Sequence, residues 1–437
     1  MNRFPRFCML TFTALALAGC GSLFKDDDKP PLPGERISVI ALQRDLQPDT
    51  AAEGTQTPAL PDPWQNAYWP QAGGFPTHVM QNPALGRQVQ QVWSTDIGKG
   101  SSRGLPLTAQ PIVADGRVYT LDTNSVVQAT DLKTGDTLWR ISVKPKREDE
   151  VVIGGGLSMS AGRLFVAAGY AEIAVVDVTK GVVMGRIPLP SAARAAPTVL
   201  DERIYVTTLD NRLLAFQALD GIKLWEFQGL PGETGLVRAA SAGATRDIVV
   251  PVFSSGEIYA LRVENGSVAW GENLGPVTEY GGIQSISAIS GLPVLDTGLV
   301  IAASYGAKIA AIDERTGQRL WQRDIGSAHT PWVAGEWVYV LSTNNEIVAL
   351  HKLTGQIRWV TPLKDKNKDK WIQYAGPVLA GNLLYVASSE GHLLRIDPLT
   401  GQDQGTLSIG SATKIAPIVA NETLLLVTED GSLIAYR

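Results

Sequence analysis

From about residue 88 onward, short apolar and polar runs alternate along the chain and turn residues separate them, which is typical of β-strands. Two stretches, residues 129–139 and 311–321, show the pattern in full. Each begins Ala-x-Asp, continues through a Thr-Gly turn and ends in a tryptophan four residues after the glycine. Because glycine readily takes the positive φ of a tight turn, each stretch predicts two strands joined by a hairpin.

The hairpin recurs along the chain at intervals of 38 to 51 residues, the size of one four-stranded propeller blade. Its turn glycine stands at Gly135, Gly181, Gly221, Gly266, Gly317, Gly355 and Gly401. A second pattern, Pro-x-x-x-x-Gly-x-x-Tyr or a relative of it, precedes the hairpins, as from Pro111 to Tyr119. It predicts an inner strand, a tight turn and a second strand.

A tryptophan follows most of the turns at a fixed distance. We expect each indole to pack between neighbouring blades, because one blade cannot bury its own faces. Two repeats carry Gly185 and Gly405 at this position, so their interfaces must be filled differently. Together with the tryptophan of an N-terminal strand, the predicted structural set is Trp93, Trp139, Trp225, Trp270, Trp321 and Trp359.

The last repeat, residues 417–437, holds only three strands' worth of sequence. Residues 88–93 alternate like a strand and place Trp93 46 residues before Trp139. The sequence therefore predicts an all-β fold over residues 88–437. We expect an eight-bladed β-propeller of four-stranded antiparallel blades, with the last blade closed by the N-terminal strand. Such closure removes the open sheet edges that invite aggregation.

The first 19 residues have the composition of a secretory signal peptide, with Arg3 and Arg6 ahead of an uncharged, mostly apolar stretch. The stretch ends in Leu-Ala-Gly before Cys20, which matches the bacterial lipoprotein box. We expect a covalent lipid on Cys20 that anchors the mature chain to a membrane, and no other cofactor.

Residues 20–87 are predicted to be a lipid-anchored, proline-rich tether, because ten of the 26 prolines fall here. Its aromatic residues Trp64, Tyr68, Trp69 and Phe75 are costly to leave in water, so we expect them to pack on the chain's own globular part. The alternative is that residues 37–42 add as a strand to the sheet of a partner.

Composition and charge exclude several functions. Charged residues make up 19% and hydrophobic residues 44% of the chain, which favours a folded protein. The net charge of −5 offers no basic excess for nucleic acid. The four histidines are scattered, and no zinc-protease helix motif or phosphate-binding loop is present. The sequence therefore predicts no catalytic site and no metal site.

The Ala-x-Asp-x-x-x-Gly-x-x-x-Trp repeat resembles the docking motif of the quinoprotein dehydrogenase propellers. Together with the lipoprotein box and the eight repeats, it resembles the BamB family of outer-membrane assembly lipoproteins. That resemblance implies a scaffold on the periplasmic face of the outer membrane. It also implies binding to the periplasmic POTRA domains of BamA and to other subunits of the assembly machinery. The expected task is to aid folding and insertion of nascent outer-membrane β-barrel proteins.

The resemblance also implies a contact surface. In the family a Leu-x-Leu-Arg loop around the third and fourth blades contacts BamA. The matching residues here are Leu236, Val237 and Arg238, with Val237 in place of the second leucine and Gly235 in place of the first. A nearby family loop carries two aspartates, whereas residues 285–290 carry none. We expect Leu236, Val237 and Arg238 to bind the partner.

Two alternatives remain open: a quinone-dependent dehydrogenase, and a propeller adhesin or cell-envelope scaffold. The dehydrogenase family pattern includes an adjacent pair of cysteines and acidic calcium ligands, but no cysteine follows Cys20. Aspartates at the turn position are expected to cap backbone N–H groups instead. They are Asp131, Asp177, Asp313 and Asp397. We therefore expect a non-catalytic protein.

Overall fold

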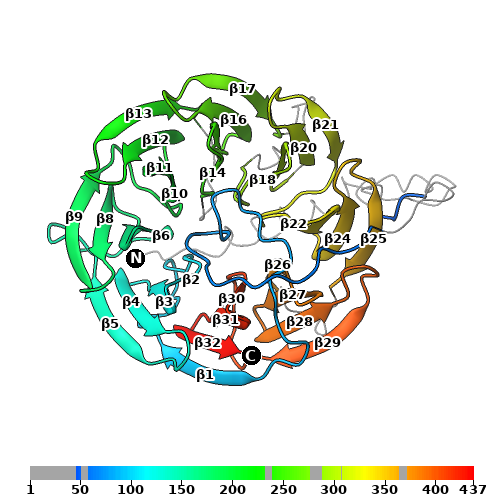
Figure 1. Cartoon of the computed structure of the whole chain (residues 1–437), viewed down its shortest axis with the longest axis horizontal. Helices are drawn as coiled ribbons and strands as arrows, with labels where there is room; N and C mark the ends of the chain where they lie inside the picture. Colours follow the sequence, from blue (N-terminus) through cyan, green and yellow to red (C-terminus); the bar gives the residue numbers. More distant parts are fainter. Residues whose placement is uncertain (1–45, 51–57, 232–238, 276–287, 307, 364–371) are drawn as a thin grey trace, which may run out of the picture. The chain divides into compact units, whose positions relative to one another are not determined.

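A computed structural model of the chain describes residues 46–50, 58–231, 239–275, 288–306, 308–363 and 372–437. Eight four-stranded antiparallel sheets stand as blades around a central axis (Figure 1). Residues 47–437 form one compact unit. The predicted all-β, eight-bladed propeller is confirmed.

Blades 1 to 7 each run from an innermost to an outermost strand in chain order, whereas the outermost strand of blade 8 is the first of the chain. Blade 1 consists of β2 (Ile112–Ala114), β3 (Arg117–Leu121), β4 (Val126–Asp131) and β5 (Thr137–Ser142). Blade 2 consists of β6 (Gly156–Ser160), β7 (Arg163–Ala167), β8 (Glu172–Asp177) and β9 (Val182–Pro188). Blade 3 consists of β10 (Thr198–Leu200), β11 (Arg203–Thr207), β12 (Arg212–Gln217) and β13 (Lys223–Gln228). Blade 4 consists of β14 (Gly243–Ala244), β15 (Ile248–Val250), β16 (Glu257–Arg262) and β17 (Val268–Asn273).

The second half of the ring repeats this order. Blade 5 consists of β18 (Val294–Asp296), β19 (Leu299–Ala303), β20 (Ile309–Asp313) and β21 (Arg319–Arg323). Blade 6 consists of β22 (Trp332–Ala334), β23 (Trp337–Leu341), β24 (Glu346–His351) and β25 (Ile357–Pro362). Blade 7 consists of β26 (Tyr374–Ala380), β27 (Leu383–Ser388), β28 (His392–Ile396) and β29 (Asp403–Ser408). Blade 8 consists of β30 (Ile418–Ala420), β31 (Thr423–Val427), β32 (Ser432–Tyr436) and β1 (Gln91–Asp96).

Blade 8 joins the two ends of the propeller. Its outermost strand, β1, pairs antiparallel with β32, and Trp93 lies opposite Ala435. Gln90 and Arg437 exchange two further backbone hydrogen bonds of 2.8 and 3.0 Å. The predicted closure by the N-terminal strand is therefore confirmed, and it leaves no unpaired strand between the first and last repeats.

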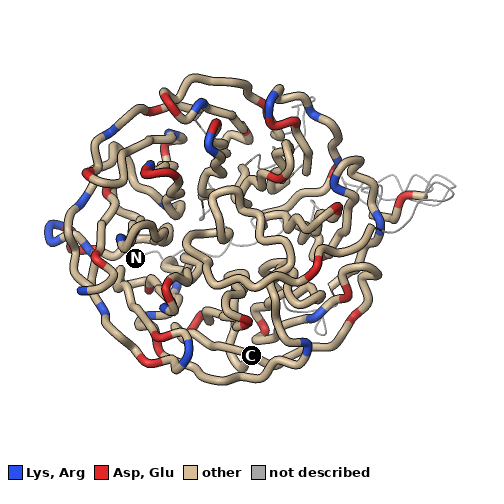
Figure 2. The backbone as a smooth tube through the Cα atoms, in the orientation of Figure 1, with Lys and Arg blue, Asp and Glu red and all other residues tan. Residues whose placement is uncertain are grey.

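Burial follows the position of a strand within its blade. The inner strands are buried along nearly their whole length because neighbouring blades cover both faces. The outermost strands alternate between buried and exposed residues, as β13 does. Charged residues are spread around the ring, and its centre carries few of them (Figure 2). Within the described residues, no helix has the length and apolar character needed to cross a bilayer.

Candidate functional site

The six tryptophans of the repeat lie where neighbouring blades meet. Each indole Nε1 donates to a main-chain oxygen of the following blade, at 2.7–3.1 Å. The acceptor is always the residue three positions before the turn glycine, as with Trp139 and Val178. The acceptors are Leu132, Val178, Val263, Glu314, Lys352 and Pro398.

The turn glycine of the following blade forms the surface on which each indole rests. A Cβ on Gly317, for example, would lie 2.6 Å from the Trp270 side chain. The other five pairs are equally close, at 2.6–2.8 Å or, for Gly266, 2.5 Å. Glycine is required at this position for two reasons. The turn needs a positive φ, and the indole occupies the space that a Cβ would take. The sequence pattern indicated the first requirement and not the second.

The interface between blades 2 and 3 lacks a tryptophan because Gly185 occupies its position. Here Ile187 reaches the turn, and a Cβ on Gly221 would lie 2.8 Å from its Cγ1. The main-chain oxygen of Ala218, three residues before Gly221, accepts from Arg163 Nη1 at 3.1 Å. Arg117 makes the same bond to the Val178 main-chain oxygen beside Trp139, so Ile187 alone takes the place of the indole.

The turn aspartates hold the hairpins. Asp131 Oδ1 accepts from the backbone N–H groups of Lys133 and Thr134, both at 2.9 Å. The bond from the Thr134 N–H is the main reason that the pKa of Asp131 lies below its ordinary value. Asp177, Asp313 and Asp397 make the same pair of bonds. These carboxylates are committed to local backbone structure.

The other predicted site residues lie outside the described part of the chain. Cys20 is one of them, and so are Leu236, Val237 and Arg238. Residues 285–287, the first half of the second family loop, also lie outside it, whereas residues 288–290 are described. The described residues that follow these two undescribed segments, Ala239 and Ala288, line one crevice of about 40 Å³ between blades 3 and 4.

Two exposed leucines flank this crevice. Leu209 lines it directly, and Leu230 precedes the undescribed residues 232–238. Their exposed fractions are 40% and 60%. Sequence analysis did not single them out, although an apolar residue within the polar turn at 207–211 was a usable signal. The crevice and its two leucines lie beside Ala239 and Ala288, the first described residues after the two undescribed segments.

Polar groups hold the Leu230 backbone in place. Asn211 Nδ2 donates to the Leu230 main-chain oxygen at 2.7 Å, and Ser254 Oγ of blade 4 donates to Asn211 Oδ1 at 3.0 Å. Glu257 Oε2 accepts from the Leu230 N–H at 2.7 Å, while its Oε1 accepts from Tyr259. That last bond to a carboxylate raises the pKa of Tyr259 to about 12. The surface is therefore preorganised by contacts that join two blades.

A second feature lies at the centre of the ring, where residues 58–85, here called the strap, make one circuit of the inner strands (Figure 1). In every blade one backbone N–H of the innermost strand, or of the residue after it, donates to a strap oxygen at 2.6–2.9 Å. In the order of the strap, the donors are Asn421, Val113, Met159, Val199, Ala244, Leu295, Gly335 and Gly381. The strap thus accepts one backbone N–H from the inner edge of each of the eight blades.

The strap is part of the hydrophobic core. Trp69 is 1% exposed, exchanges two backbone hydrogen bonds of 2.8 Å with Val113, and stacks on Trp332 with ring centroids 6.3 Å apart. Met80 and Asn82 are also buried. The expectation that the aromatic residues pack on the chain's own globular part agrees with this arrangement for Trp64, Trp69 and Phe75. Tyr68 is 47% exposed, and residues 37–42 lie outside the described part.

His78 is the buried titratable group of the strap. Its Nδ1 donates to the Pro293 main-chain oxygen at 2.6 Å, so the neutral ring carries its proton there. Burial lowers the pKa of His78 to about 4, although that hydrogen bond opposes the shift. Its Nε2 is buried without a hydrogen-bond partner. A second proton on Nε2 would therefore be a buried, unpaired donor.

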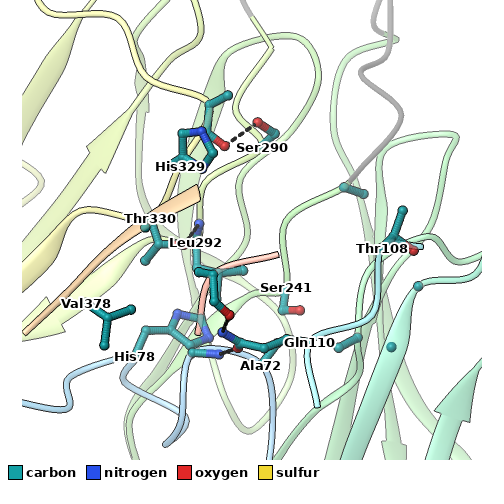
Figure 3. Close-up of a pocket in the computed structure, with 18 of the residues that line it drawn as sticks. Ala72, His78, Thr108, Gln110, Ser241, Ser290, Leu292, His329, Thr330 and Val378 are labelled. Atoms are coloured by element: carbon teal, nitrogen blue, oxygen red, sulfur yellow. Dashed lines mark hydrogen bonds between the residues drawn. The ribbon is translucent and has the colours of Figure 1, made fainter. Parts of the chain in front are cut away.

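The strap closes one side of a central cavity of about 100 Å³. Figure 3 shows the strap residues Ala72 and His78 at one end of the lining group, with His329 and Ser290 at the other. All eight blades contribute to the lining. Ala239 lines both this cavity and the crevice between blades 3 and 4.

The cavity does not fit the calcium-bound quinone of the dehydrogenase propellers. None of its described lining residues is an aspartate or a glutamate, whereas calcium prefers carboxylate oxygens. Its volume is also below the roughly 300 Å³ at which pockets for ligands of cofactor size begin. In the described part of the chain, no group of three or more His, Cys, Asp or Glu side chains is placed to hold a metal ion.

Residues 123–361 match the family model described as outer membrane protein assembly factor BamB, which covers more than half of the chain. The chain belongs to the BamB family. The BamB assembly factor of Yersinia pestis is 26% identical over 353 residues, which is 79% of this chain and 88% of that protein. By family, the chain is an outer-membrane protein assembly factor.

Solved structures share the fold. The BamB crystal structure from Moraxella catarrhalis superposes with a TM-score of 0.69 at 19% identity and covers 80% of this chain and 100% of its own. The quinohemoprotein alcohol dehydrogenase of Comamonas testosteroni reaches 0.67 at 12% identity and covers 85% of this chain and 80% of its own. The propeller is therefore common to BamB proteins and to dehydrogenases, and function has to be argued from the sites.

Proposed function

We propose that this chain is a non-catalytic scaffold subunit of the outer-membrane β-barrel assembly machinery. In this proposal the crevice between blades 3 and 4 binds the periplasmic POTRA domains of BamA. Cys20 carries the lipid that holds the chain on the periplasmic face of the outer membrane. The scaffold presents a fixed surface and so aids folding and insertion of nascent β-barrel proteins.

Family membership and one structural observation support the binding surface. The observation is that Leu209 and Leu230 stay 40% and 60% exposed beside a crevice at the ends of both partner loops. Burying two such leucines on a partner would release water from apolar surface, at about 25 cal/mol per Å². The bonds from Asn211 and Glu257 hold the Leu230 backbone, so little order has to be gained on binding.

The absence of catalysis is supported by the chemistry of the described sites. The turn aspartates cap backbone N–H groups, and the central cavity has no carboxylate among its described lining residues. The second candidate, a quinone-dependent dehydrogenase, would need ligands that these sites do not offer. Calorimetry that detected quinone and calcium binding to the purified chain would overturn the non-catalytic assignment.

Photo-crosslinking in cells tests the BamA surface. A photoreactive amino acid at Leu209 or Leu230 is expected to capture BamA. Leu399 and Leu353 on blades 7 and 6 are matched controls, because they are 40% and 54% exposed and lie far from the crevice in the ring. Equal capture from the control positions, or none from Leu209 and Leu230, would refute the surface. Recovery of other cell-envelope components without BamA would favour the adhesin or envelope-scaffold alternative.

Replacement of Cys20 tests the anchor. The wild-type chain is expected to fractionate with the outer membrane and to carry an acyl mass on its N-terminal peptide. Cys20→Ser should move the chain out of the membrane fraction and remove that mass. A variant that stays in the membrane fraction, together with a wild-type peptide of unmodified mass, would contradict the proposed lipid.

A further inference from the structure

The interface between blades 2 and 3 has open space where six other interfaces hold an indole. Gly185 stands in β9 four residues after its turn glycine, the position at which those repeats carry tryptophan. Apart from its chain neighbours, a Cβ on Gly185 would meet no described atom within 4 Å. Its φ lies outside the left-handed region. The backbone therefore allows a side chain here, and the space for one is empty.

The acceptor that binds an indole N–H elsewhere is also kept at this interface. Beside Trp139, the Val178 main-chain oxygen accepts two bonds of 3.0 Å, one from the indole Nε1 and one from Arg117 Nη1. The equivalent oxygen here, on Ala218, has the arginine bond from Arg163 Nη1 at 3.1 Å but no indole donor. The place of one N–H donor is therefore open.

A cleft of about 340 Å³ lies at the same interface. Its apolar walls come from both blades, with Pro188 and Pro190 from blade 2 and Leu214 and Phe216 from blade 3. Gly221, the turn glycine that Ile187 reaches, also lines the cleft. The volume exceeds the roughly 300 Å³ at which ligand pockets begin. Ile187 takes the place of the indole, but it leaves room beside it for a further side chain.

The charges of the cleft are balanced. Lys223 Nζ lies 2.8 Å from Glu226 Oε2, and these two side chains are the only charged ones among the described residues that line the cleft. The lining therefore has no net charge with which to attract an ion. Its apolar walls fit an uncharged and largely apolar group instead.

Exposed apolar side chains adjoin the cleft in the sequence. Leu219 and Ile222 stand on either side of Gly221 and are 66% and 60% exposed. None of the other six hairpin turns has an apolar residue both two positions before and one position after its glycine. Met184, which precedes Gly185, is 56% exposed. Exposed apolar residues that gather in this way are typical of interaction sites.

We propose that this interface binds an exposed tryptophan side chain of a partner polypeptide. The indole enters from the circumference between β9 and β13, which are neighbours there (Figure 1). It lies against Gly221 and the apolar walls of the cleft and donates its N–H to the Ala218 main-chain oxygen. Six filled interfaces show how an indole fits this backbone, which favours tryptophan over other aromatic side chains. The site is separate from the crevice between blades 3 and 4, so it does not rest on the proposed contact with BamA.

Fluorine NMR with the full-length chain and N-acetyl-5-fluorotryptophanamide tests the proposal, because the tryptophans of the protein itself give no fluorine signal. We expect saturable broadening of the signal from this compound. The same compound methylated on the indole nitrogen has no N–H to donate and should bind at least fivefold more weakly. Gly185→Trp places an indole of the chain itself in the open space and should weaken binding of the unmethylated compound at least tenfold.

Gly86→Trp is the matched control. Gly86 also has open space around its Cβ position and no left-handed φ, and it lies outside the cleft, so this variant should bind as the wild type does. Leu219→Lys combined with Ile222→Lys changes side chains that already meet water and should weaken binding at least threefold.

Three results would refute the proposal. They are no binding of the fluorinated compound, equal binding of its methylated form, and a loss of binding in Gly86→Trp as large as that in Gly185→Trp. Circular dichroism shows whether Gly185→Trp folds. If it does not fold, the double lysine variant decides in its place, and unchanged binding to that variant refutes the site.

Discussion

The inner and outer edges of the blades are the same kind of structure, a row of unpaired backbone groups on the last strand of a sheet. Their surroundings are opposite. At the inner edge, every blade donates a hydrogen bond to the strap, and strap residues such as Trp69 and Asn82 are buried. At the outer edge, the described part of the chain covers β25 alone, through Asp49. The inner edges serve the stability of the ring, whereas the other outer edges have no further described segment beside them.

Geometry explains the difference. The inner edges converge on a small mouth, so a strap of roughly 30 residues, which spans at most about 100 Å when extended, reaches all of them. The outer edges diverge around the circumference, where the same length would reach only a few. A single segment can therefore bond to every inner edge, whereas one segment of this length cannot reach all of the outer edges.

The largest expected effect follows from removing the main anchor of the strap. Trp69→Ala should lower the free energy of unfolding by about 3–5 kcal/mol, because it empties a fully buried indole site. Tyr68→Ala is the control, because Tyr68 is next to Trp69 in the sequence but is 47% exposed. It should change the free energy of unfolding by less than about 0.5 kcal/mol. Urea denaturation measures both. Equal effects would mean that the strap does not contribute to the stability of the ring.

Acid should destabilise the fold through His78, another buried residue of the strap. The pKa of His78 is about 4 in the folded chain and 6.5 in the unfolded reference, so the unfolded chain binds more protons between these values. The stability contribution is complete above pH 6.5 and is lost as pH falls toward 4. At pH 5 the loss is about 2 kcal/mol relative to neutral pH. His78→Gln should remove this part of the pH dependence in denaturation curves, and an unchanged slope would refute the assignment.

Sequence reasoning recovered the features that repeat. The hairpin, the fixed place of the tryptophans and the strand at residues 88–93 are local patterns, so their periodicity predicted the blades and the closure between β1 and β32. The path of the strap has no periodicity to reveal it. Its contacts join residues far apart in the chain, as where Asn66 Nδ2 donates to the Val419 main-chain oxygen across 353 positions. Aromatic composition indicated burial but could not name the partner.

The same limit applies to sites made by two repeats. Gly185 showed that a tryptophan was missing, yet its replacement by Ile187 depends on how two blades face each other. Leu209 and Leu230 likewise could not be recognised from the sequence, because the crevice beside them is formed by residues of both blade 3 and blade 4.

The close approach of the strap to blade 7 gives a smaller effect. Gly381 has φ +54°, and a Cβ there would lie 2.2 Å from the Leu85 main-chain oxygen. Gly116, in the corresponding turn of blade 1, has φ +70° and open space around its Cβ position. Both alanine variants carry backbone strain of about 1 kcal/mol, but Gly381→Ala must also displace the strap and should cost about 1–2 kcal/mol more. Thermal unfolding compares them, and equal losses would argue against a tight strap at blade 7.

The smallest effect is expected at the outer edge, where Val268 and Ile357 both stand two residues after a turn glycine but differ in exposure. Val268→Lys should change the free energy of unfolding by less than about 0.5 kcal/mol, because the side chain already meets water. Ile357→Lys should cost about 1 kcal/mol, since the lysine replaces a side chain that is 6% exposed and has to bring its charged end to solvent. Denaturation of both variants measures the difference. If Val268→Lys is the more damaging of the two, blade 4 needs its exposed valine for folding, and the distinction between covered and available outer edges fails.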